Sequence, residues 1–490
     1  MVVIGAGLGG LAAAARLARL RHDVVVVEAA DDIGGLLGRH TTGSFGWDTG
    51  ATTVTLPATL RDLFLKTGRP LETVVELEPL EPLAHYRFAE GTRMDLPNTG
   101  LADVVAHFDA ALGGRAGEEW RQFHDYATRL WTVVRGPFVE SPLTGARDLA
   151  RLAARHPGQL TAVTGRRTLR DVAERFFPND RQRVLLEHHA TRAGADPRRA
   201  PAFFAVWPYV EQTFGGWSVR GGMRRLVEAV HDRAVDRGAV VHTGAAVVAI
   251  TTSAGRVDGV RLADGRHLPT DIVVSDVDAG HLYGDLLGHA PSRRRRVRLR
   301  PSASAFTLML GLRGRTPAIR RHSVLFPRDV DAELDGVFGA TAKAVREPTL
   351  DVRVSHDPED APAGCEAWTV TVSAPPHGSG AGAIDWTADG LAAGYAHQLV
   401  DRLAARGFDV RDRIALSAYR SPADIERATG SPGGAAHGRR VDGFLAAVRR
   451  PANRSPLPGL FLVGGSAHPG AGVPLVTMSA ALVADMVGRA

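Results

Sequence analysis

The pattern of apolar positions at the start of the chain predicts a strand, a helix and a second strand. Residues 1–4 (MVVI) are apolar and mostly β-branched, residues 11–20 (LAAAARLARL) are rich in alanine and leucine, and residues 23–28 (DVVVVE) form another apolar run. Short β-branched runs are typical of strands, whereas the alanine-rich stretch favours a helix. The order strand, turn, helix, strand is how a nucleotide-binding α/β fold begins.

The α/β pattern returns twice later in the chain. Between residues 217 and 278 a glycine pair starts a helix, VVHTGAAVVAI predicts two short strands, and RVDGVRLADGRHL predicts a hairpin that turns at Asp264 and Gly265. Near the end, GLFLV predicts a buried strand, and a helix opens around Pro474. We therefore expect a Rossmann-like α/β domain assembled from three segments, residues 1–80, 214–291 and 459–490.

Two insertions interrupt this domain, residues 81–213 and 292–458. The first is rich in helical patterns, and the second contains the strand-like runs SAFTLMLGL, DVRVS and AWTVTVSAP, which suit a sheet that floors a cavity. We expect an inserted α+β substrate domain made of a mixed sheet plus helices. The apolar stripe of the first insertion predicts a helix core, with the lining of a long tunnel or a helix that dips into lipid as alternatives: it contains Trp120, Phe123, Ala127, Leu130, Trp131 and Val134.

A glycine-rich turn between the first strand and the first helix predicts a dinucleotide site. Gly5, Gly7 and Gly10 have the G-x-G-x-x-G spacing, which permits a sharp turn, close approach of a pyrophosphate and tight packing of helix on strand. The following strand ends in Glu28, at the position expected to accept hydrogen bonds from an adenosine ribose. An acid there favours an unphosphorylated 2′-hydroxyl, as in FAD or NAD.

A second glycine motif favours FAD. Gly34, Gly35 and Arg39 follow soon after Glu28, and in FAD enzymes such a pair folds back along the cofactor while an arginine pairs with phosphate oxygens. No second G-x-G-x-x-G follows a strand later in the chain, so we expect no NAD domain. The electrons should then leave to oxygen, a quinone or another acceptor.

Composition agrees with a globular protein of several folding units. The 490 residues contain 44% hydrophobic and 23% charged residues, and at roughly 100–200 residues per domain the length predicts about two to four units. The single cysteine, Cys365, excludes an intrachain disulfide and a CxxC redox pair. With no signal segment and no run of about 18 apolar residues, we expect a cytoplasmic protein, with peripheral contact to the inner face of the cell membrane left open.

The basic residues and histidines do not lead us to expect a nucleic-acid site or a metal site. The net charge is +6, and only Lys66 and Lys343 are lysines. A run of arginines could bind nucleic acid or anionic lipid, but without an aromatic platform we expect a solvated face and no nucleic acid: it comprises Arg293, Arg294, Arg295, Arg296, Arg298 and Arg300. His188 and His189 are adjacent and no HExxH or Cys/His cluster exists, so we expect no metal and a helix surface with satisfied hydrogen bonds at this pair.

Five motifs together resemble the bacterial-type phytoene desaturase family, within the wider group of FAD-dependent amine-oxidase-like flavoproteins. They are VVIGAGLGGLAAA, FGWDTGAT, VEQTFGGWSVRGGMRRLVEAV, DIVVSDVDAGHLYGDLL and GLFLVGGSAHPGAGVPLVTMSAALVA, and the resemblance covers nearly the whole chain. It departs at two places. Gly465, Ser466 and Ala467 stand where relatives often carry an acid, and Arg39 follows the glycine pair two residues later than in the common pattern.

The resemblance implies where FAD binds. Val247 and Val248 would hydrogen-bond adenine through the backbone, and the helix that starts at Gly472 would direct about half a positive charge at the flavin. His468 is expected either as a turn residue or as a contact to flavin or substrate. The expected cofactor contacts are Gly5, Gly7, Leu8, Gly9, Gly10, Glu28, Ala29, Gly34, Gly35, Arg39, Thr49, Gly50, Ala51, Thr52, Val247, Val248, Gly464, Gly465, Gly472, Val473 and Pro474.

The activity that the resemblance implies is FAD-dependent desaturation of a long hydrophobic isoprenoid, phytoene-like or carotenoid-like, with hydride transfer to flavin N5. Arg167 occupies a place similar to an active-site arginine of carotene desaturases. Carotenoid ketolases, oxidases, isomerases and saturases share these motifs and remain alternatives. An amine oxidase usually has a lysine near N5, and neither lysine lies in a flavin motif; a non-catalytic flavin- or lipid-binding scaffold is the remaining class.

Overall fold

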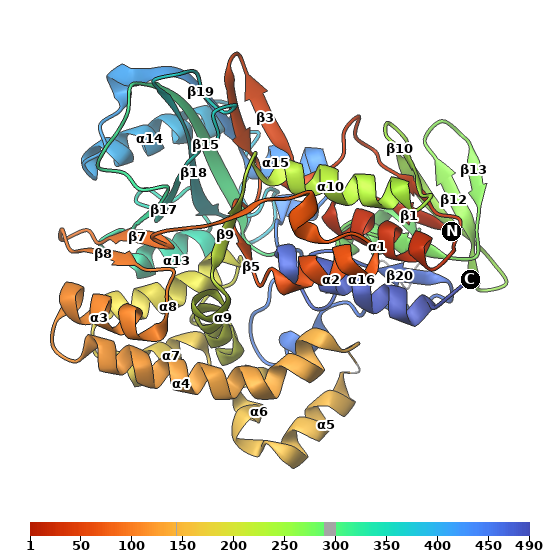
Figure 1. Ribbon diagram of the computed structural model, residues 1–490, viewed down its shortest axis with the longest axis horizontal. Helices are drawn as coiled ribbons and strands as arrows, with labels where there is room; N and C mark the ends of the chain where they lie inside the picture. The colour runs from red at the N-terminus through yellow and green to blue at the C-terminus, as the bar shows by residue number, and fades with distance from the viewer. Residues whose placement is uncertain (144, 289–299) are drawn as a thin grey trace.

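The computed structural model describes residues 1–143, 145–288 and 300–490, and Figure 1 shows how they are arranged. The α/β domain carries both chain ends, on the right of the view. The large mixed sheet lies at the upper left and the helices of the first insertion at the lower left. The arginines at 293–298 fall outside the described residues, so their expected role stays a prediction.

A five-stranded parallel sheet forms the centre of the α/β domain. Its strand order is β10-β2-β1-β14-β20, with bounds Val240–His242, Val25–Val27, Val2–Ile4, Val273–Ser275 and Leu460–Leu462. The central strands therefore come from the three segments that the sequence predicted. Since the strands are parallel, their carboxyl ends meet at one edge of the sheet, where ligands bind in such folds.

Helices cover one face of this sheet and a small antiparallel sheet covers the other. Strand residues of one face pack with α1 (Leu8–Arg19), α10 (Met223–Asp236) and α16 (Val473–Val487). The opposite face packs against β11 (Val247–Ser253) and β12 (Arg256–Leu262). The predicted hairpin is confirmed, because β12 pairs with β13 (His267–Pro269) on either side of the turn at Asp264 and Gly265.

A seven-stranded mixed sheet forms the floor of the second unit. Its order is β19-β15-β18-β17-β16-β7-β8, with bounds Ile414–Arg420, Ser304–Arg313, Cys365–Ala374, Leu350–Val354, His322–Leu325, Ala84–Arg87 and Arg93–Leu96. One face packs against α14 (Leu391–Ala405) around Phe306, Trp368 and Leu399. Strands β7 and β8 come from the first insertion, so both insertions build this sheet; the domain boundaries themselves stay predictions.

The remainder of the first insertion is helical. Its helices are α3 (Leu101–Leu112), α4 (Ala116–Arg135), α5 (Ala146–Arg155), α6 (Pro157–Thr164), α7 (Leu169–Phe176), α8 (Asp180–Arg192) and α9 (Val206–Phe214). The apolar stripe of α4 is buried as predicted, with Trp120 stacked on Phe108 at a ring-centroid distance of 4.3 Å. In Figure 1, α5 and α6 project from the bottom of the molecule.

Smaller elements connect the units. They are the hairpin β3 (Arg39–Thr42) and β4 (Phe45–Asp48), the three-stranded sheet of β5 (Val54–Thr55), β9 (Gly216–Val219) and β6 (Leu77–Pro79), and the helices α2 (Ala58–Lys66), α11 (Ala279–His281), α13 (Val330–Phe338) and α15 (Pro422–Thr429).

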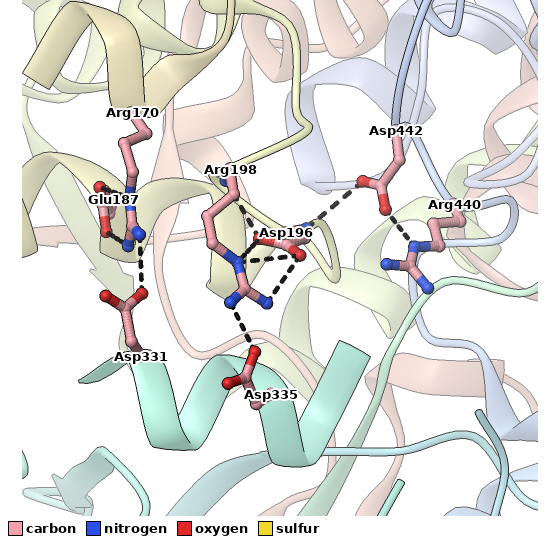
Figure 2. Close-up of polar contacts among 8 residues, drawn as sticks. All are labelled: Arg170, Glu187, Asp196, Arg198, Asp331, Asp335, Arg440 and Asp442. Carbon is pink, nitrogen blue, oxygen red and sulfur yellow. Dashed lines mark hydrogen bonds and ion pairs between the residues drawn. The ribbon is translucent and has the colours of Figure 1, made fainter. Parts of the chain in front are cut away.

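Ion pairs join the helices to α13, as Figure 2 shows. Arg170 of α7 donates to both carboxylate oxygens of Glu187 on α8, at 2.7 and 2.8 Å, and to Asp331 of α13 at 2.7 Å. Arg198 similarly contacts Asp196 and, at 2.6 Å, Asp335 one turn further along α13. These pairs fix the helical layer against the sheet unit.

Candidate active site

The glycine-rich loop after β1 is closed tightly by its own backbone. A Cβ atom at Gly10 would lie 2.0 Å from the carbonyl oxygen of Gly5, so only glycine fits at position 10. Gly5 has a φ of 98°, which favours glycine. The loop delivers the chain into the N-terminus of α1, where the backbone amides of the first turn suit a pyrophosphate.

Glu28, at the carboxyl end of β2, is fixed against this loop. Its carboxylate accepts hydrogen bonds from the backbone amides of Ala6 at 2.6 Å and Ala30 at 2.9 Å. The loop before β11 passes the same point, where the amide of Ala245 donates to the carbonyl of Glu28 at 2.7 Å. Glu28 therefore lies between the two elements expected to hold the adenosine half of the cofactor, and Ala29 follows it in the same turn.

The second glycine pair contacts the first glycine motif. Gly34 donates to the carbonyl of Ala6 at 2.9 Å, and Gly34 and Gly7 form a parallel bridge. A Cβ atom at Gly50 would lie 2.1 Å from the carbonyl of Leu36, so the segment Thr49–Thr52 also returns to this place. Three stretches predicted to bind the cofactor thus converge on one loop.

Arg39 has a protein partner in this structure. Its guanidinium forms an ion pair with Asp360 at 2.5 Å and donates to the carbonyl of Glu359 at 3.3 Å, in the loop that follows β17. This contact links the hairpin β3–β4 to the large sheet. The predicted pairing of Arg39 with cofactor phosphate stays a prediction, and the structure supports a role for Arg39 in joining the two units.

The predicted adenine contact lies at an irregular position in β11. The register of β11 against β12 shifts between Val247 and Ala249, which leaves Val248 outside the ladder. The Val248 side chain is 46% exposed. A backbone amide and carbonyl that do not pair in the sheet are free to bind an adenine edge, so the geometry is compatible with the prediction.

The C-terminal motif brings two glycines and a helix start to the same sheet edge. The amide of Gly464 donates to the Ser479 hydroxyl at 2.9 Å, and the carbonyl of Gly465 accepts from Arg450 at 2.7 Å. Gly472 precedes α16, with Val473 and Pro474 as its first residues. The free amides of this first turn carry partial positive charge, which would favour a reduced, anionic flavin.

His468 is a turn residue. It is 2% exposed, and its Nε2 lies 2.9 Å from the carbonyl oxygen of Ser141, so the motif is tied to the first insertion. Burial lowers the pKa of His468 to about 4, so its ring is neutral at pH 7.

Asp48 was not predicted individually, although its motif FGWDTGAT was. Its Oδ2 accepts from the amide of Met223 at 3.0 Å, at the N-terminus of α10, while its Oδ1 is buried without a hydrogen-bond partner. Burial raises the pKa of Asp48 to about 6. The acid two residues before Gly50 in this motif was the signal for a capping role.

A cavity of about 460 Å³ lies between the hairpin β3–β4, strand β9 and the large sheet. Thr52, an expected cofactor contact, and Thr369 of β18 both line it. Its wall also carries charged residues, including Asp48, Glu78, Arg321, Arg353 and Asp360. The sheet does floor a cavity, as expected, and its wall combines these charged groups with apolar side chains such as Leu80 and Val354. The apolar stripe of α4, whose alternative role was to line a tunnel, does not line this cavity.

A second polar contact connects the sheet with the segment after Thr52. Arg353 of β17 donates to Asp351 at 2.9 Å and to the hydroxyl of Thr53 at 2.7 Å. His322 of β16 lies 3.3 Å from the same carboxylate. Alternation along DVRV placed Asp351 and Arg353 on one face of the strand, but the sequence did not show that this face turns toward the cofactor segments.

The prediction of a satisfied helix surface at His188 and His189 was wrong, because each ring has one buried nitrogen without a hydrogen-bond partner, Nε2 of His188 and Nδ1 of His189. His189 is only 9% exposed and lies 3.8 Å from the carboxylate of Glu211, which forms an ion pair with Arg192 at 2.5 Å. Burial lowers the pKa of His189 to about 4. Within the described ranges, no group of three metal-ligating side chains occurs.

Arg167 lies just before α7, away from the contacts of the glycine motifs. Its backbone amide donates to Thr161 and its carbonyl accepts from Ala202, which fixes the turn between α6 and α7. Burial raises the pKa of Tyr126, and the neighbouring charge of Arg167 opposes that rise. The structure thus positions Arg167 beside a buried phenol in the helical unit, and its catalytic role stays a prediction.

Comparison with known proteins identifies the family. The sequence pattern of the family described as flavin containing amine oxidoreductase matches residues 8–336. The chain is similar to hydroxyneurosporene desaturase of Cereibacter sphaeroides, with 32% identity covering 100% of this chain and 98% of that protein. It is also similar to 4,4′-diapolycopene oxygenase of Methylomonas sp, with 31% identity covering 99% and 97%.

Solved structures agree on the fold. Putrescine oxidase bound to putrescine superposes with a TM-score of 0.66 at 14% identity, covering 99% of this chain and 98% of that one. Cyclohexylamine oxidase from Brevibacterium oxydans gives a TM-score of 0.63 at 17% identity over the same shares.

The chain belongs to the flavin-containing amine oxidoreductase family, and it is an FAD-dependent oxidoreductase. Within that family it groups with the bacterial carotenoid desaturases. In the part of the chain that the structure describes, no helix combines the length and apolar character needed to cross a bilayer.

Proposed function

We propose that this protein desaturates a long hydrophobic isoprenoid, phytoene-like or carotenoid-like. The observation that carries the proposal is the similarity to hydroxyneurosporene desaturase over the complete chain, together with convergence of all three glycine motifs on one site. FAD, when bound, supplies the acceptor for a hydride through its N5.

The chain's own residues would hold the cofactor and favour its reduced form. The β1–α1 loop and Glu28 bind the dinucleotide, and the first turn of α16 stabilises negative charge without a charged side chain. Arg167, the proposed catalytic residue, would orient or polarise the reacting end of the substrate. Replacing Arg167 by Ala should abolish turnover and leave the flavin spectrum intact, whereas Arg166→Ala, at its exposed neighbour, should change neither.

Expression in cells that accumulate phytoene tests the activity. A desaturase should lengthen the conjugated system and shift pigment absorption to longer wavelength without adding oxygen. Anaerobic mixing of the purified yellow protein with phytoene or neurosporene should bleach the flavin absorbance. Unchanged pigment and an unbleached flavin with every polyene in the panel would contradict the proposal and favour a binding scaffold.

An oxygenase is the second candidate, because one similar relative is named 4,4′-diapolycopene oxygenase. Mass spectrometry of the product separates the two functions. Loss of two hydrogens supports desaturation, and gain of an oxygen atom supports the oxygenase.

The electron acceptor and the membrane contact also remain proposals. We propose oxygen or a quinone as acceptor, tested by the rate at which each reoxidises the bleached enzyme.

Peripheral membrane contact is supported by α5, where the exposed Arg147, Arg151 and Arg155 recur every four residues. Replacing all three by Gln should reduce sedimentation with vesicles that contain anionic lipid, and undiminished sedimentation would contradict the contact.

A further inference from the structure

One carboxyl group of the cofactor site belongs to no motif predicted to bind FAD. Asp276 directly follows β14, the strand next to β1, and its amide donates to the carbonyl of Ile4 at 2.8 Å. The parallel pairing of β1 and β14 brings Asp276 to the glycine-rich loop. Its side chain then extends along that loop and is half-buried.

The Asp276 carboxyl group occupies space that is open only because three neighbouring residues are glycines. A Cβ atom at Gly9 would lie 2.4 Å from Asp276 Oδ1, and one at Gly7 would lie 2.6 Å from Oδ2. A Cβ atom at Gly464, in the C-terminal motif, would lie 2.1 Å from Oδ1. The carboxyl group therefore lies between the first and the last glycine motifs, next to the loop that is expected to bind the pyrophosphate.

Charges around Asp276 oppose its ionisation. Burial and the nearby Glu28 carboxylate both raise the pKa of Asp276, and the hydrogen bond from the amide of Gly10 lowers it; the resulting pKa is about 7. The β1–α1 loop has no ionisable side chain, and the C-terminal glycine motif carries His468, whose ring is neutral at pH 7 because its pKa is lowered to about 4. On its own segment, Asp278 directs its carboxylate to the amide of Gly280 at 2.7 Å, which starts α11. A bound pyrophosphate would add negative charge on the same side.

We propose that Asp276 is a neutral, proton-carrying contact of bound FAD, and that FAD binding and protonation of this carboxyl group are coupled. A neutral carboxylic acid can donate a hydrogen bond to a phosphate oxygen, whereas a carboxylate at the same place would repel it. FAD thus selects the protonated form. Above the pKa of the free protein, each binding event takes up a proton at Asp276.

The coupling between FAD binding and protonation of Asp276 determines how the Kd for FAD depends on pH. Below about pH 6 the group already holds its proton, so the Kd for FAD should be constant. Above about pH 7 the free protein loses the proton, and the Kd should rise by about tenfold per pH unit until the bound form also titrates. Asp276→Asn keeps the shape and a hydrogen-bond donor without a titration, so its Kd should stay flat and close to the low-pH value of the wild type.

The experiment follows release of FAD from the full-length holoenzyme. Samples at a series of pH values between about 5.5 and 9 are diluted, and the recovery of flavin fluorescence gives the Kd. Asp271→Asn is the matched control, because Asp271 is exposed at the opposite end of β14. It should reproduce the wild-type profile. A flat wild-type profile, or a rise that persists in Asp276→Asn, would overturn the proposal.

A second measurement needs no variant. Titration calorimetry of FAD into the flavin-free wild type, in buffers of different ionisation enthalpy, counts the protons taken up. Uptake should approach one proton near pH 8 and fall toward zero near about pH 6. No uptake at either pH overturns the proposal even if Asp276→Asn fails to fold. Neither experiment uses a substrate, so the desaturase proposal stands or falls separately.

Discussion

Gly10 is a position where a single methyl group has a predictable cost. The structure leaves 2.0 Å between a Cβ atom there and the carbonyl of Gly5, so Gly10→Ala must displace the turn or the start of α1. Overpacking of this kind destabilises by about 1–3 kcal/mol. We expect a lower free energy of unfolding in urea and weaker retention of FAD.

Gly394, the fourth residue of α14, is the control for Gly10. Nothing lies within 4 Å of a Cβ atom at Gly394, and alanine is favoured over glycine inside a helix by about 0.5–1 kcal/mol. Gly394→Ala should therefore preserve or raise stability. Equal losses from both substitutions would show that the Gly5–Gly10 turn is not tightly closed.

Asp48 should contribute to the pH dependence of stability. Its pKa is about 6 when folded and 3.8 in the unfolded reference, so between these values the folded state binds more protons. Stability from this group therefore falls as pH rises through that window and is lowest above it. Asp48→Asn removes this slope, and after a discount for partial exposure the difference between pH 4 and pH 7 should be about 1–2 kcal/mol.

The measurement for Asp48 is chemical unfolding at several pH values, compared between wild type and variant. Asp264→Asn provides a control of opposite sign, because hydrogen bonds from the Arg266 backbone and side chain lower the pKa of Asp264. Its substitution should leave the downward slope in place. The assignment to Asp48 fails if Asp48→Asn and wild type show parallel profiles.

At the scale of elements, the ion pairs of Figure 2 should differ in how much they contribute to the free energy of unfolding. Glu187 has 6% of its side chain exposed and accepts two hydrogen bonds from Arg170, whereas Asp331 is 60% exposed. Glu187→Ala leaves Arg170 half-buried without its main partner and should cost about 1–3 kcal/mol. Asp331→Ala should cost less than about 1 kcal/mol.

A thermal or urea unfolding series on these two variants checks the difference, and the double variant adds the coupling between them. Hydrogen exchange in α7 and α8 should increase only in Glu187→Ala. Equal effects of the two substitutions would mean that exposure does not decide the strength of these pairs.

Local sequence patterns predicted the helices and strands themselves, but they did not predict which distant elements pack or pair with one another. The strand–loop–helix–strand sequence of residues 2–27 formed as expected, because apolar runs and glycines specify it within a short stretch. That β7 joins β16 could not be predicted, since Ser323 pairs with His85 across more than 200 residues. For the same reason Asp360 was not expected beside Arg39, nor Asp276 beside Gly9.

At the scale of the whole molecule, FAD should act as part of the folded structure. FAD is expected to contact motifs from three segments that come together only in the folded state. A ligand that binds only the folded state stabilises it by mass action, by about 2.7 kcal/mol at 100 times the Kd. Removal of FAD should lower the unfolding midpoint, and adding FAD back should restore it. Differential scanning calorimetry measures the shift.

FMN is the control for FAD, because it lacks the adenosine half that Glu28 and β11 are expected to hold. It should restore only a small part of the midpoint. An equal shift with FMN, or none with FAD, would contradict the placement of the adenosine half at these two elements.

The parallel sheet has a consequence for biosynthesis. Strand β20 lies beside β14 and supplies Gly464 next to Asp276, yet it is made almost 190 residues after β14 and about 460 after β1. A nascent chain on the ribosome therefore carries two of the three segments of the cofactor site before the third segment, with β20 and Gly464, has been translated. Flavin should be acquired only after β20 and Gly464 have left the ribosome, and ribosome-stalled chains that stop before residue 460 should remain colourless.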